Sequence, residues 1–257
     1  MIRTFRALGR VLRVAVFLAA FSLRMRARKP AEDSAEFEGW RRDYFGGACR
    51  GILDRLRIRV LHEGSFPAEG GILVTNHLGY IDVFVLASLG PTVFVSRADV
   101  EHWPVIGPLT RWCSTIYIDR ERPDQIPQVI EQMSESLSTG AQVVFFPEGT
   151  SGAGDLVMPF RASLFGVAAE SDAPVRVAAL TYQTLPEDPP ARDSVCWWGD
   201  AGFARHFLGL AGLREIEARV RFGDSVMRSN DRKELAKRCH AEITELFTPV
   251  TGSERPR

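Results

Sequence analysis

Cysteine is scarce in this sequence of 257 residues, and its placement excludes two kinds of site. The four cysteines, at positions 49, 113, 196 and 239, form no C-x-x-C pair. Such pairs mark the common zinc-binding and redox motifs, so the sequence indicates neither kind of site. We therefore expect reduced thiols and a protein that faces the cytosol.

The sequence also lacks the motifs of several common catalysts. Its five histidines form no ligand pair at short spacing, so a metal site is unsupported. The stretch "GTSGAG" (149–154) misses the G-x-S-x-G motif of serine hydrolases, because alanine stands where the second glycine belongs. No glycine-rich segment has the pattern of a phosphate-binding loop or a dinucleotide fingerprint. Direct attack by a substrate hydroxyl is the simplest chemistry left.

Net charge is absent from the chain as a whole, because 32 basic residues balance 32 acidic residues. The balance hides an asymmetry: residues 1–29 contain seven arginines and one lysine but no acid, so this segment carries about +8 and the rest about −8. A basic amino-terminal segment favours an anionic surface as its partner. We expect that surface to be membrane lipid, and we expect no nucleic-acid partner.

No apolar run is long enough to span a membrane by itself. The longest, residues 14–23, reaches only about 15 Å as a helix, whereas the apolar core of a bilayer is about 30 Å thick. The basic residues on both sides of this run are typical of a helix that lies in the membrane interface. The alternatives are a helix docked on the protein's own core, a longer full span, and a signal peptide, although no A-x-A cleavage pattern follows the run.

Seven short runs have the apolar or alternating pattern of β-strands. They cover residues 57–62, 71–76, 92–96, 114–119, 142–147, 175–182 and 216–222. Helical patterns separate several of them, most clearly at residues 124–140, where Asp124 is the candidate N-cap, and at residues 231–247, where Asp231 with Glu234 resembles a capping box. Strands and helices in alternation predict an α/β domain, with a largely parallel mixed sheet flanked by helices and an amino-terminal helical segment at the membrane interface.

Three polar clusters follow predicted strands at their carboxyl ends. They are "NHLGYID" (76–82), "DRERP" (119–123) and "PEGTSG" (147–152). Ligands of open α/β sheets bind at this edge, where the strands' carboxyl ends meet the following loops. The three clusters therefore predict one shared site.

His77 and Asp82 are the strongest catalytic candidates. On one regular helix, residues five positions apart point about 140° away from each other, so the two side chains could not pair there. If His77 lies in the loop before a helix and Asp82 in its first turns, the carboxylate can reach one ring nitrogen. The other nitrogen is then free to take a proton from a substrate hydroxyl, as a general base does. The structural alternative is that Asn76 and His77 cap the helix while Asp82 faces water.

The other two clusters hold candidate substrate-binding residues. Arg120 follows a strand end, where its guanidinium can form a bidentate contact with a phosphate or carboxylate. Glu148, Gly149 and Thr150 follow another strand end, where glycine lets the backbone approach a ligand and threonine supplies a hydroxyl. Taken singly, a surface arginine and a turn explain these residues equally well.

Together, "NHLGYID", "STIYIDR" and "FPEGTSG" resemble, in order and spacing, the motifs of the lysophosphatidic acid acyltransferase family, also called 1-acyl-sn-glycerol-3-phosphate acyltransferases. The resemblance covers about residues 55–185. It implies transfer of an acyl group from acyl-CoA or acyl-carrier protein to the free hydroxyl of a lysolipid, with no further cofactor. It also implies an amino-terminal helical pair in the bilayer surface, at the cytoplasmic face of the inner membrane.

The resemblance gives roles to the residues of the three motifs. It implies His77 and Asp82 as the catalytic pair, Arg120 as the phosphate-binding residue, and Glu148, Gly149 and Thr150 in substrate binding. We accordingly assign residues 1–55 to amphipathic, basic membrane-associating helices, residues 56–250 to the acyltransferase domain and residues 251–257 to a frayed tail.

Three positions depart from the family pattern, and they bear on the acceptor rather than on the reaction. Gly79 stands where serine is common, Ser114 where glycine usually opens the second motif, and Val177 where proline is common in the fourth. The first acceptor implied is 1-acyl-sn-glycerol-3-phosphate, which would give phosphatidic acid. The segment 196–210 resembles members that act on lyso-ornithine lipid, which is the alternative acceptor; a non-catalytic lipid-binding protein is a further alternative. In that segment Trp197 and Trp198 either line the lipid entrance or fill core, and we expect core.

Overall fold

The computed structural model describes residues 2–31, 36–103, 107, 110–111, 113–119 and 122–250. The predicted frayed tail lies outside the described residues. The α-helices are α1 (Ile2–Arg28), α2 (Phe37–Leu56), α3 (Ile81–Leu89), α5 (Ile126–Ser138), α6 (Gly166–Ser171), α7 (Ala191–Ser194), α8 (Phe203–Ala211) and α9 (Arg232–Leu246). The β-strands are β1 (Ile58–Glu63), β2 (Gly71–Thr75), β3 (Thr92–Arg97), β4 (Ile116–Ile118), β5 (Gln142–Phe145), β6 (Val175–Thr184) and β7 (Ile216–Phe222). Short 3₁₀ turns lie at Ala98–His102, Pro123–Gln125 and Ser163–Phe165.

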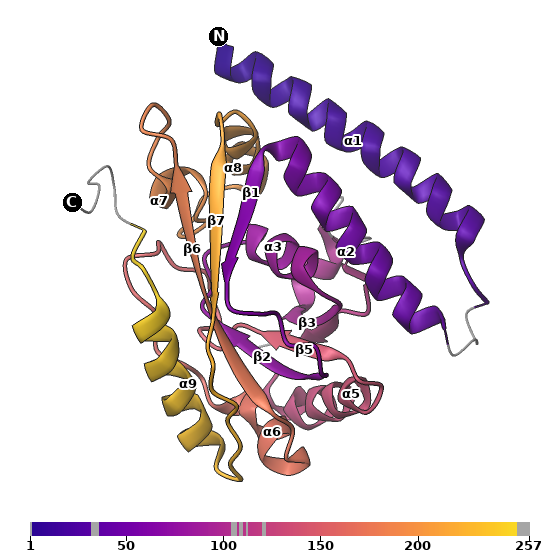
Figure 1. The fold of residues 1–257 in the computed structure, drawn as a ribbon, viewed down its shortest axis with the longest axis vertical. Helices are drawn as coiled ribbons and strands as arrows, with labels where there is room; N and C mark the ends of the chain where they lie inside the picture. The colour runs from indigo at the N-terminus through magenta and orange to yellow at the C-terminus, as the bar shows by residue number, and fades with distance from the viewer. Residues whose placement is uncertain are drawn as a thin grey trace.

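The seven predicted strands form one sheet, in the order β1-β7-β6-β2-β5-β3-β4 (Figure 1). Neighbouring strands run parallel except β6 and β7, which are antiparallel. The central strand β2 is buried at every position, as its continuous apolar sequence indicates for a parallel strand covered on both faces. The predicted α/β fold with a largely parallel mixed sheet is confirmed.

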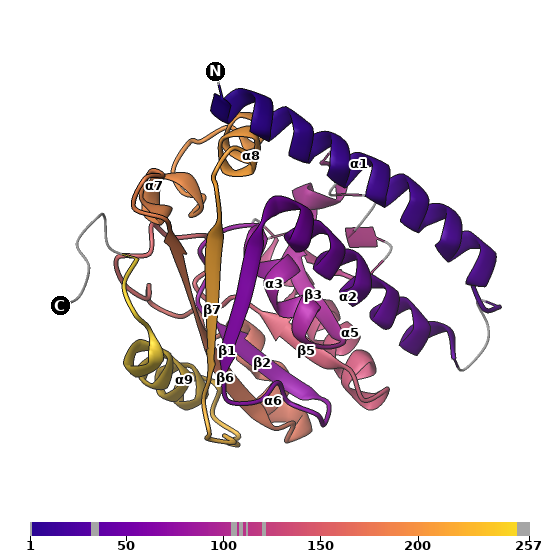
Figure 2. The same ribbon diagram turned by 45° about the horizontal axis from the view of Figure 1, so that its top comes forward.

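Helices cover both faces of this sheet and enclose two apolar cores. Residues of α1, α2, α3 and α8 pack on one face, and residues of α5, α6 and α9 pack on the other (Figures 1 and 2). Because β2, β3, β4 and β5 are parallel, their carboxyl ends meet at one edge, as the predicted shared site requires.

The ends of the two clearest predicted helices differ in how well the sequence placed them. Asp231 caps α9 as predicted, because its carboxylate accepts hydrogen bonds from the backbone N–H groups of Lys233 and Glu234. The expected cap of α5 by Asp124 is wrong: the helix begins one residue later, and the Asp124 carboxylate pairs with Arg122 instead.

Three arginines of the basic segment turn toward the protein. Arg10 is buried, and its guanidinium donates hydrogen bonds to the backbone carbonyls of Leu56, Ala211, Leu213 and Arg214, at the ends of α2 and α8. The carbonyls of the last turn of a helix have no partner within the helix, so a buried cation there satisfies them. Towards the same end of α8, Arg3 donates to the Gly209 carbonyl and Arg6 to the Gly212 carbonyl. On this face α1 is docked on the protein's own core.

The opposite face of α1 is apolar and exposed. Its side chains include Phe5, Leu12, Val16 and Leu23, which are 60–69% exposed. They recur at helical spacing along one stripe, while Ala7 and Val14 lie on the buried side. In both views α1 runs along the outside of α2 (Figures 1 and 2). In the described part of the chain, no helix is long and apolar enough to cross a membrane.

Candidate active site

The chain leaves the sheet after β2 through Asn76, whose side chain continues the strand pairing. Backbone pairing of β2 with β6 extends to Thr75, opposite Ala178. Beyond it, the buried Asn76 amide group donates to the Leu180 carbonyl at 3.0 Å and accepts from the Leu180 N–H at 2.7 Å. These two hydrogen bonds take the place of one backbone pair between β2 and β6. The next residues can therefore form a loop while the Leu180 N–H and carbonyl groups keep their partners.

His77 lies in this loop and Asp82 in the first turn of α3, as the sequence predicted. The Nδ1 atom of His77 is 2.7 Å from the Asp82 Oδ2 atom. Asp82 is fully buried, and residue 80 takes the N-cap position without a side-chain cap. The alternative in which Asp82 faces water is therefore wrong.

The hydrogen bonds around Asp82 fix the tautomer of His77. Oδ2 also accepts hydrogen bonds from the backbone N–H groups of Leu78, at 2.6 Å, and Gly79, at 3.0 Å, and Oδ1 accepts one from the Tyr182 hydroxyl at 2.7 Å. An ionised carboxylate only accepts, so Nδ1 of His77 carries the proton and Nε2 keeps a free lone pair. Tyr182 was not predicted, because only the pairing of β6 with β2 brings it to this edge.

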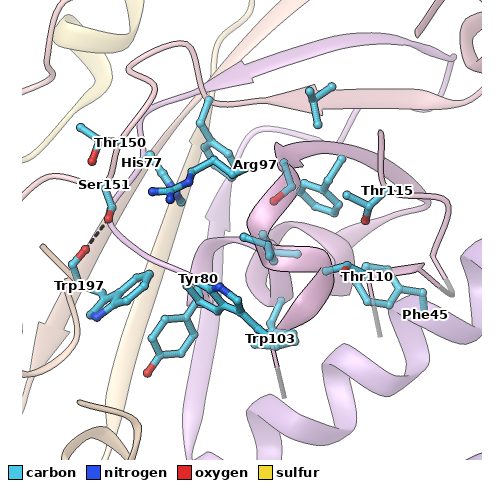
Figure 3. A pocket seen from close by; sticks show the side chains of 17 residues that line it. Phe45, His77, Tyr80, Arg97, Trp103, Thr110, Thr115, Thr150, Ser151 and Trp197 are labelled. Atoms are coloured by element: carbon cyan, nitrogen blue, oxygen red, sulfur yellow. Dashed lines mark hydrogen bonds between the residues drawn. The ribbon is translucent and has the colours of Figure 1, made fainter. Parts of the chain in front are cut away.

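His77 opens onto a largely apolar pocket of about 150 Å³ (Figure 3). Its side chain is 21% exposed, and its ring stacks on Phe146 with the centroids 4.1 Å apart. The aromatic lining comes from five segments far apart in the sequence, and its members are Phe45, Tyr80, Phe84, Phe94, Trp103, Phe146 and Trp197. The polar lining is Ser96, Arg97, Thr110, Thr115, Thr150 and Ser151. An apolar cavity with few polar groups beside a candidate base suits a ligand with a long hydrocarbon chain.

The wall at Tyr80 is held by a neutral histidine. Burial lowers the pKa of His206 below its ordinary value. The Nε2 atom of His206 lies 3.1 Å from the Cys196 carbonyl, which can only accept, and its Nδ1 atom lies 3.0 Å from the Tyr80 hydroxyl. Nε2 therefore donates and Nδ1 accepts, and α8 is thereby tied to the pocket.

The two tryptophans that we expected to fill core do not. Trp197 lines the pocket, where its carbonyl accepts a hydrogen bond from the Ser151 hydroxyl (Figure 3). Trp198 is 41% exposed, and the Arg192 guanidinium lies 5.1 Å from its ring centroid. Both residues lie in the connection between α7 and α8, outside the sheet's cores.

The structure separates the three residues of the predicted Glu148-Gly149-Thr150 unit. The buried Glu148 carboxylate accepts a hydrogen bond from the backbone N–H of His77 at 3.2 Å, so it contacts the loop of the candidate base. Thr150 lines the pocket. Gly149 has φ +78° and lines an adjoining cavity of about 240 Å³, where a Cβ would meet the Arg161 Nε at 3.1 Å.

Arg120 lies outside the described residues, and the arginine that lines the pocket among those described is Arg97. Arg97, at the end of β3, lines the pocket and forms a bidentate pair with Asp99, with N–O distances of 2.8 and 3.0 Å. No sequence pattern marks Arg97 as a site residue, because a single arginine at a strand end is common. No group of three or more metal-ligating side chains occurs in the described ranges.

Comparison with known proteins places the chain in a family. A family model described as "Acyltransferase" matches residues 57–180. A lyso-ornithine lipid O-acyltransferase of Brucella abortus is 31% identical over 237 residues, which are 85% of this chain and 87% of that protein. A 1-acyl-sn-glycerol-3-phosphate acyltransferase of Neisseria meningitidis is 29% identical over 67% of this chain and 68% of its own length. The chain belongs to the lysophosphatidic acid acyltransferase family.

The fold of this chain also matches that of a solved acyltransferase structure. The crystal structure of the 1-acyl-sn-glycerophosphate (LPA) acyltransferase PlsC from Thermotoga maritima superposes with a TM-score of 0.68 and covers 95% of each chain. The two sequences are only 15% identical, so this likeness concerns the fold. Family membership makes the chain an O-acyltransferase, as the ordered motifs implied.

We predict that Glu148 makes folding stability depend on pH. Burial raises the pKa of Glu148 from its ordinary value of 4.5 to about 8, against the lowering effect of the backbone N–H groups of His77 and Met158. The folded protein thus keeps a proton that the unfolded chain loses, and stability falls as pH rises between about 4.5 and 8. The contribution is up to about 1.4 kcal/mol per pH unit.

Denaturant unfolding between pH 5 and pH 8 measures this effect. In Glu148→Gln the fall with pH should be smaller, because the amide does not titrate. Glu245→Gln, at an exposed position on α9, should leave the parent slope unchanged. Equal slopes in Glu148→Gln and the parent contradict the prediction.

Proposed function

We propose that this enzyme transfers an acyl group from a thioester donor to the free hydroxyl of a lysolipid, with His77 as the general base. The observation that carries the proposal is the His77–Asp82 pair, in which a fully buried carboxylate holds Nδ1 and leaves Nε2 for a proton from the pocket. A base with a fixed tautomer beside an apolar pocket meets the needs of hydroxyl activation on a lipid.

The reaction needs no covalent enzyme intermediate. Nε2 of His77 takes the proton of the acceptor hydroxyl as its oxygen attacks the carbonyl carbon of the thioester. The tetrahedral intermediate then breaks its C–S bond, which leaves an ester and a thiolate. The imidazolium returns its proton to the thiolate, so that one thiol and one ester are formed and His77 is neutral again. Acyl-CoA and acyl-carrier protein both supply such a thioester, and we propose no further cofactor.

The positions of the lining residues support a division of the site. The aromatic pocket suits acyl chains, and the polar groups of Thr150 and Ser151 lie at the same pocket beside His77. We propose that Arg120 binds the anionic head group of the acceptor. Glu148 supports the loop of His77, and Gly149 leaves room for the Arg161 side chain in the adjoining cavity.

Two acceptors are supported by different observations. The ordered motifs favour 1-acyl-sn-glycerol-3-phosphate, whose phosphate suits the guanidinium of Arg120. The extent of similarity favours lyso-ornithine lipid, because relatives with that activity in Brucella abortus and Rhizobium meliloti match 85% and 78% of the chain. Both acceptors present a free hydroxyl and an anionic group, so the same catalytic pair serves either.

The outer face of α1 supports a position on the membrane surface. Its exposed apolar stripe can enter the apolar boundary of a bilayer, while exposed arginines such as Arg13 and Arg24 lie beside it and suit anionic lipid head groups. We propose that residues 1–55 seat the acyltransferase at the cytoplasmic face of the inner membrane. The site of a lipid enzyme is then next to its substrates.

His77→Ala should abolish acyl transfer. Removing a general base typically costs 10²–10⁴-fold in rate, so we expect a loss of at least about 10²-fold in thiol release from acyl-CoA with a lysolipid. Binding to lipid vesicles should be unchanged, since α1 is intact. His62→Ala, at an exposed histidine on β1, is the matched control and should retain parent activity. Activity of His77→Ala within threefold of the parent would reject His77 as the base.

The same assay, run with both lysolipids, identifies the acceptor and tests Arg120. We expect thiol release above background with at least one of them; none with either contradicts the proposed function and favours a lipid-binding protein. With the active acceptor, Arg120→Ala should raise the acceptor KM by about tenfold or more and leave the donor KM unchanged. Arg122→Ala, at an exposed arginine two residues away, is the control. An unchanged acceptor KM in Arg120→Ala counts against the head-group role.

Leu12→Glu should weaken membrane binding. Leu12 is 63% exposed on the outer face of α1, so the change removes apolar area and adds a charge without disturbing the core. We expect at least about a tenfold loss of binding to anionic vesicles in cosedimentation. Gln128→Glu, at an exposed position on α5, adds the same charge elsewhere and should bind like the parent. Equal binding by Leu12→Glu and the parent would show that α1 does not contact the membrane.

A further inference from the structure

Tyr182 is a buried tyrosine whose hydroxyl points at the catalytic pair from outside the family-matched region. It lies near the carboxyl end of β6, two residues beyond the matched range, and is 1% exposed. Its hydroxyl donates to the Asp82 Oδ1 atom at 2.7 Å. A buried hydroxyl needs a partner, and here the partner is the carboxylate that orients His77.

The bond from Tyr182 fixes the rotation of the Asp82 carboxylate. The three other hydrogen bonds, from His77 and the N–H groups of Leu78 and Gly79, all reach Oδ2. A donor at Oδ1 therefore sets the plane of the carboxyl group and keeps Oδ2 directed at the imidazole. The same strand holds the start of the loop, because Leu180 pairs with the Asn76 side chain.

We propose that Tyr182 is a positioning residue for acyl transfer, which acts through Asp82 to orient His77 and to moderate the attraction between the carboxylate and the imidazolium. The proposal rests on the proposed function of His77. A hydrogen-bond donor at Oδ1 draws negative charge from the Asp82 carboxylate. The carboxylate then stabilises the protonated imidazole, which is inactive as a base, less strongly.

The other titratable groups around the His77–Asp82 pair do not place a further negative charge beside the imidazolium near neutral pH. Burial raises the pKa of Glu148, which faces the loop from β5, to about 8. Burial also raises the pKa of Cys196, from the segment after α7, and of Tyr80 above their ordinary values, so both stay uncharged. Asp82 is then the charge that His77 meets directly.

Tyr182→Phe tests the proposal, because it keeps the ring and removes the hydroxyl. We expect kcat to fall by at least about tenfold, the factor that loss of a hydrogen bond to a charged group typically represents, with both KM values within about twofold. The acid limb of the kcat profile should move to higher pH, since the protonated histidine is better stabilised. A purely structural role would leave that limb in place.

Thr181→Val is the matched control on the same strand. Its hydroxyl donates to the Thr248 carbonyl at 2.8 Å, on the face away from Asp82. The variant loses one partly buried hydrogen bond and should lose stability, yet keep the parent kcat within twofold and the parent acid limb. Thermal unfolding of both variants shows that the comparison concerns folded protein.

A double-mutant cycle separates action through Asp82 from any other loss. In the Asp82→Asn background, Tyr182→Phe should cost less than about twofold in kcat. The proposal is overturned if Tyr182→Phe keeps the parent kcat and the parent acid limb. It is also overturned if Thr181→Val changes kcat and the acid limb as much as Tyr182→Phe does, or if Tyr182→Phe lowers kcat in the Asp82→Asn background as much as it does in the parent. If His77→Ala is inactive while Tyr182→Phe matches the parent, only this inference fails; if His77→Ala is active, the proposed function fails.

Discussion

The buried carboxylate of Asp82 is the group on which the rest of the site depends. A charged group without water is stable only when hydrogen bonds replace its hydration, and Asp82 receives four of them, from the loop after β2 and from β6. That requirement explains the local fold. The chain must leave β2 at Asn76, turn back at residues 77–80 and begin α3, while β6 must extend beyond its pairing with β2. The antiparallel pairing of β6 with β7 supports that extension.

Helix α1 and the pocket belong to one connected structure. The inner face of α1 binds the end of α8 through Arg10, and α8 in turn holds the pocket wall through His206 and Tyr80. Phe45 of α2 lines the pocket itself. The amino-terminal helices therefore take part in the core of the enzyme as well as presenting an apolar surface, and changes in α1 can affect the pocket by contact.

Much of the fold and the catalytic pair could be predicted from the sequence, because their patterns are local. Apolar or alternating runs of five to eight residues marked all seven strands, and the five-residue spacing of His77 and Asp82 required a loop followed by a helix. The contributions of Tyr182 and Trp197 could not be predicted, since they depend on strand order and on how α8 packs. Charge counts likewise could not show that Arg10 is buried, because a helix with apolar residues on both faces has two possible docking sides.

Asp82 holds neutral His77 in one tautomer, with the proton on Nδ1 and a lone pair on Nε2. Nitrogen-15 NMR of the histidine-labelled acyltransferase measures this directly, with the resonances of His77 assigned by comparison with His77→Ala. With the imidazole neutral, we expect a protonated Nδ1 and an unprotonated Nε2. A proton on Nε2, or an even mixture of the two tautomers, would contradict it.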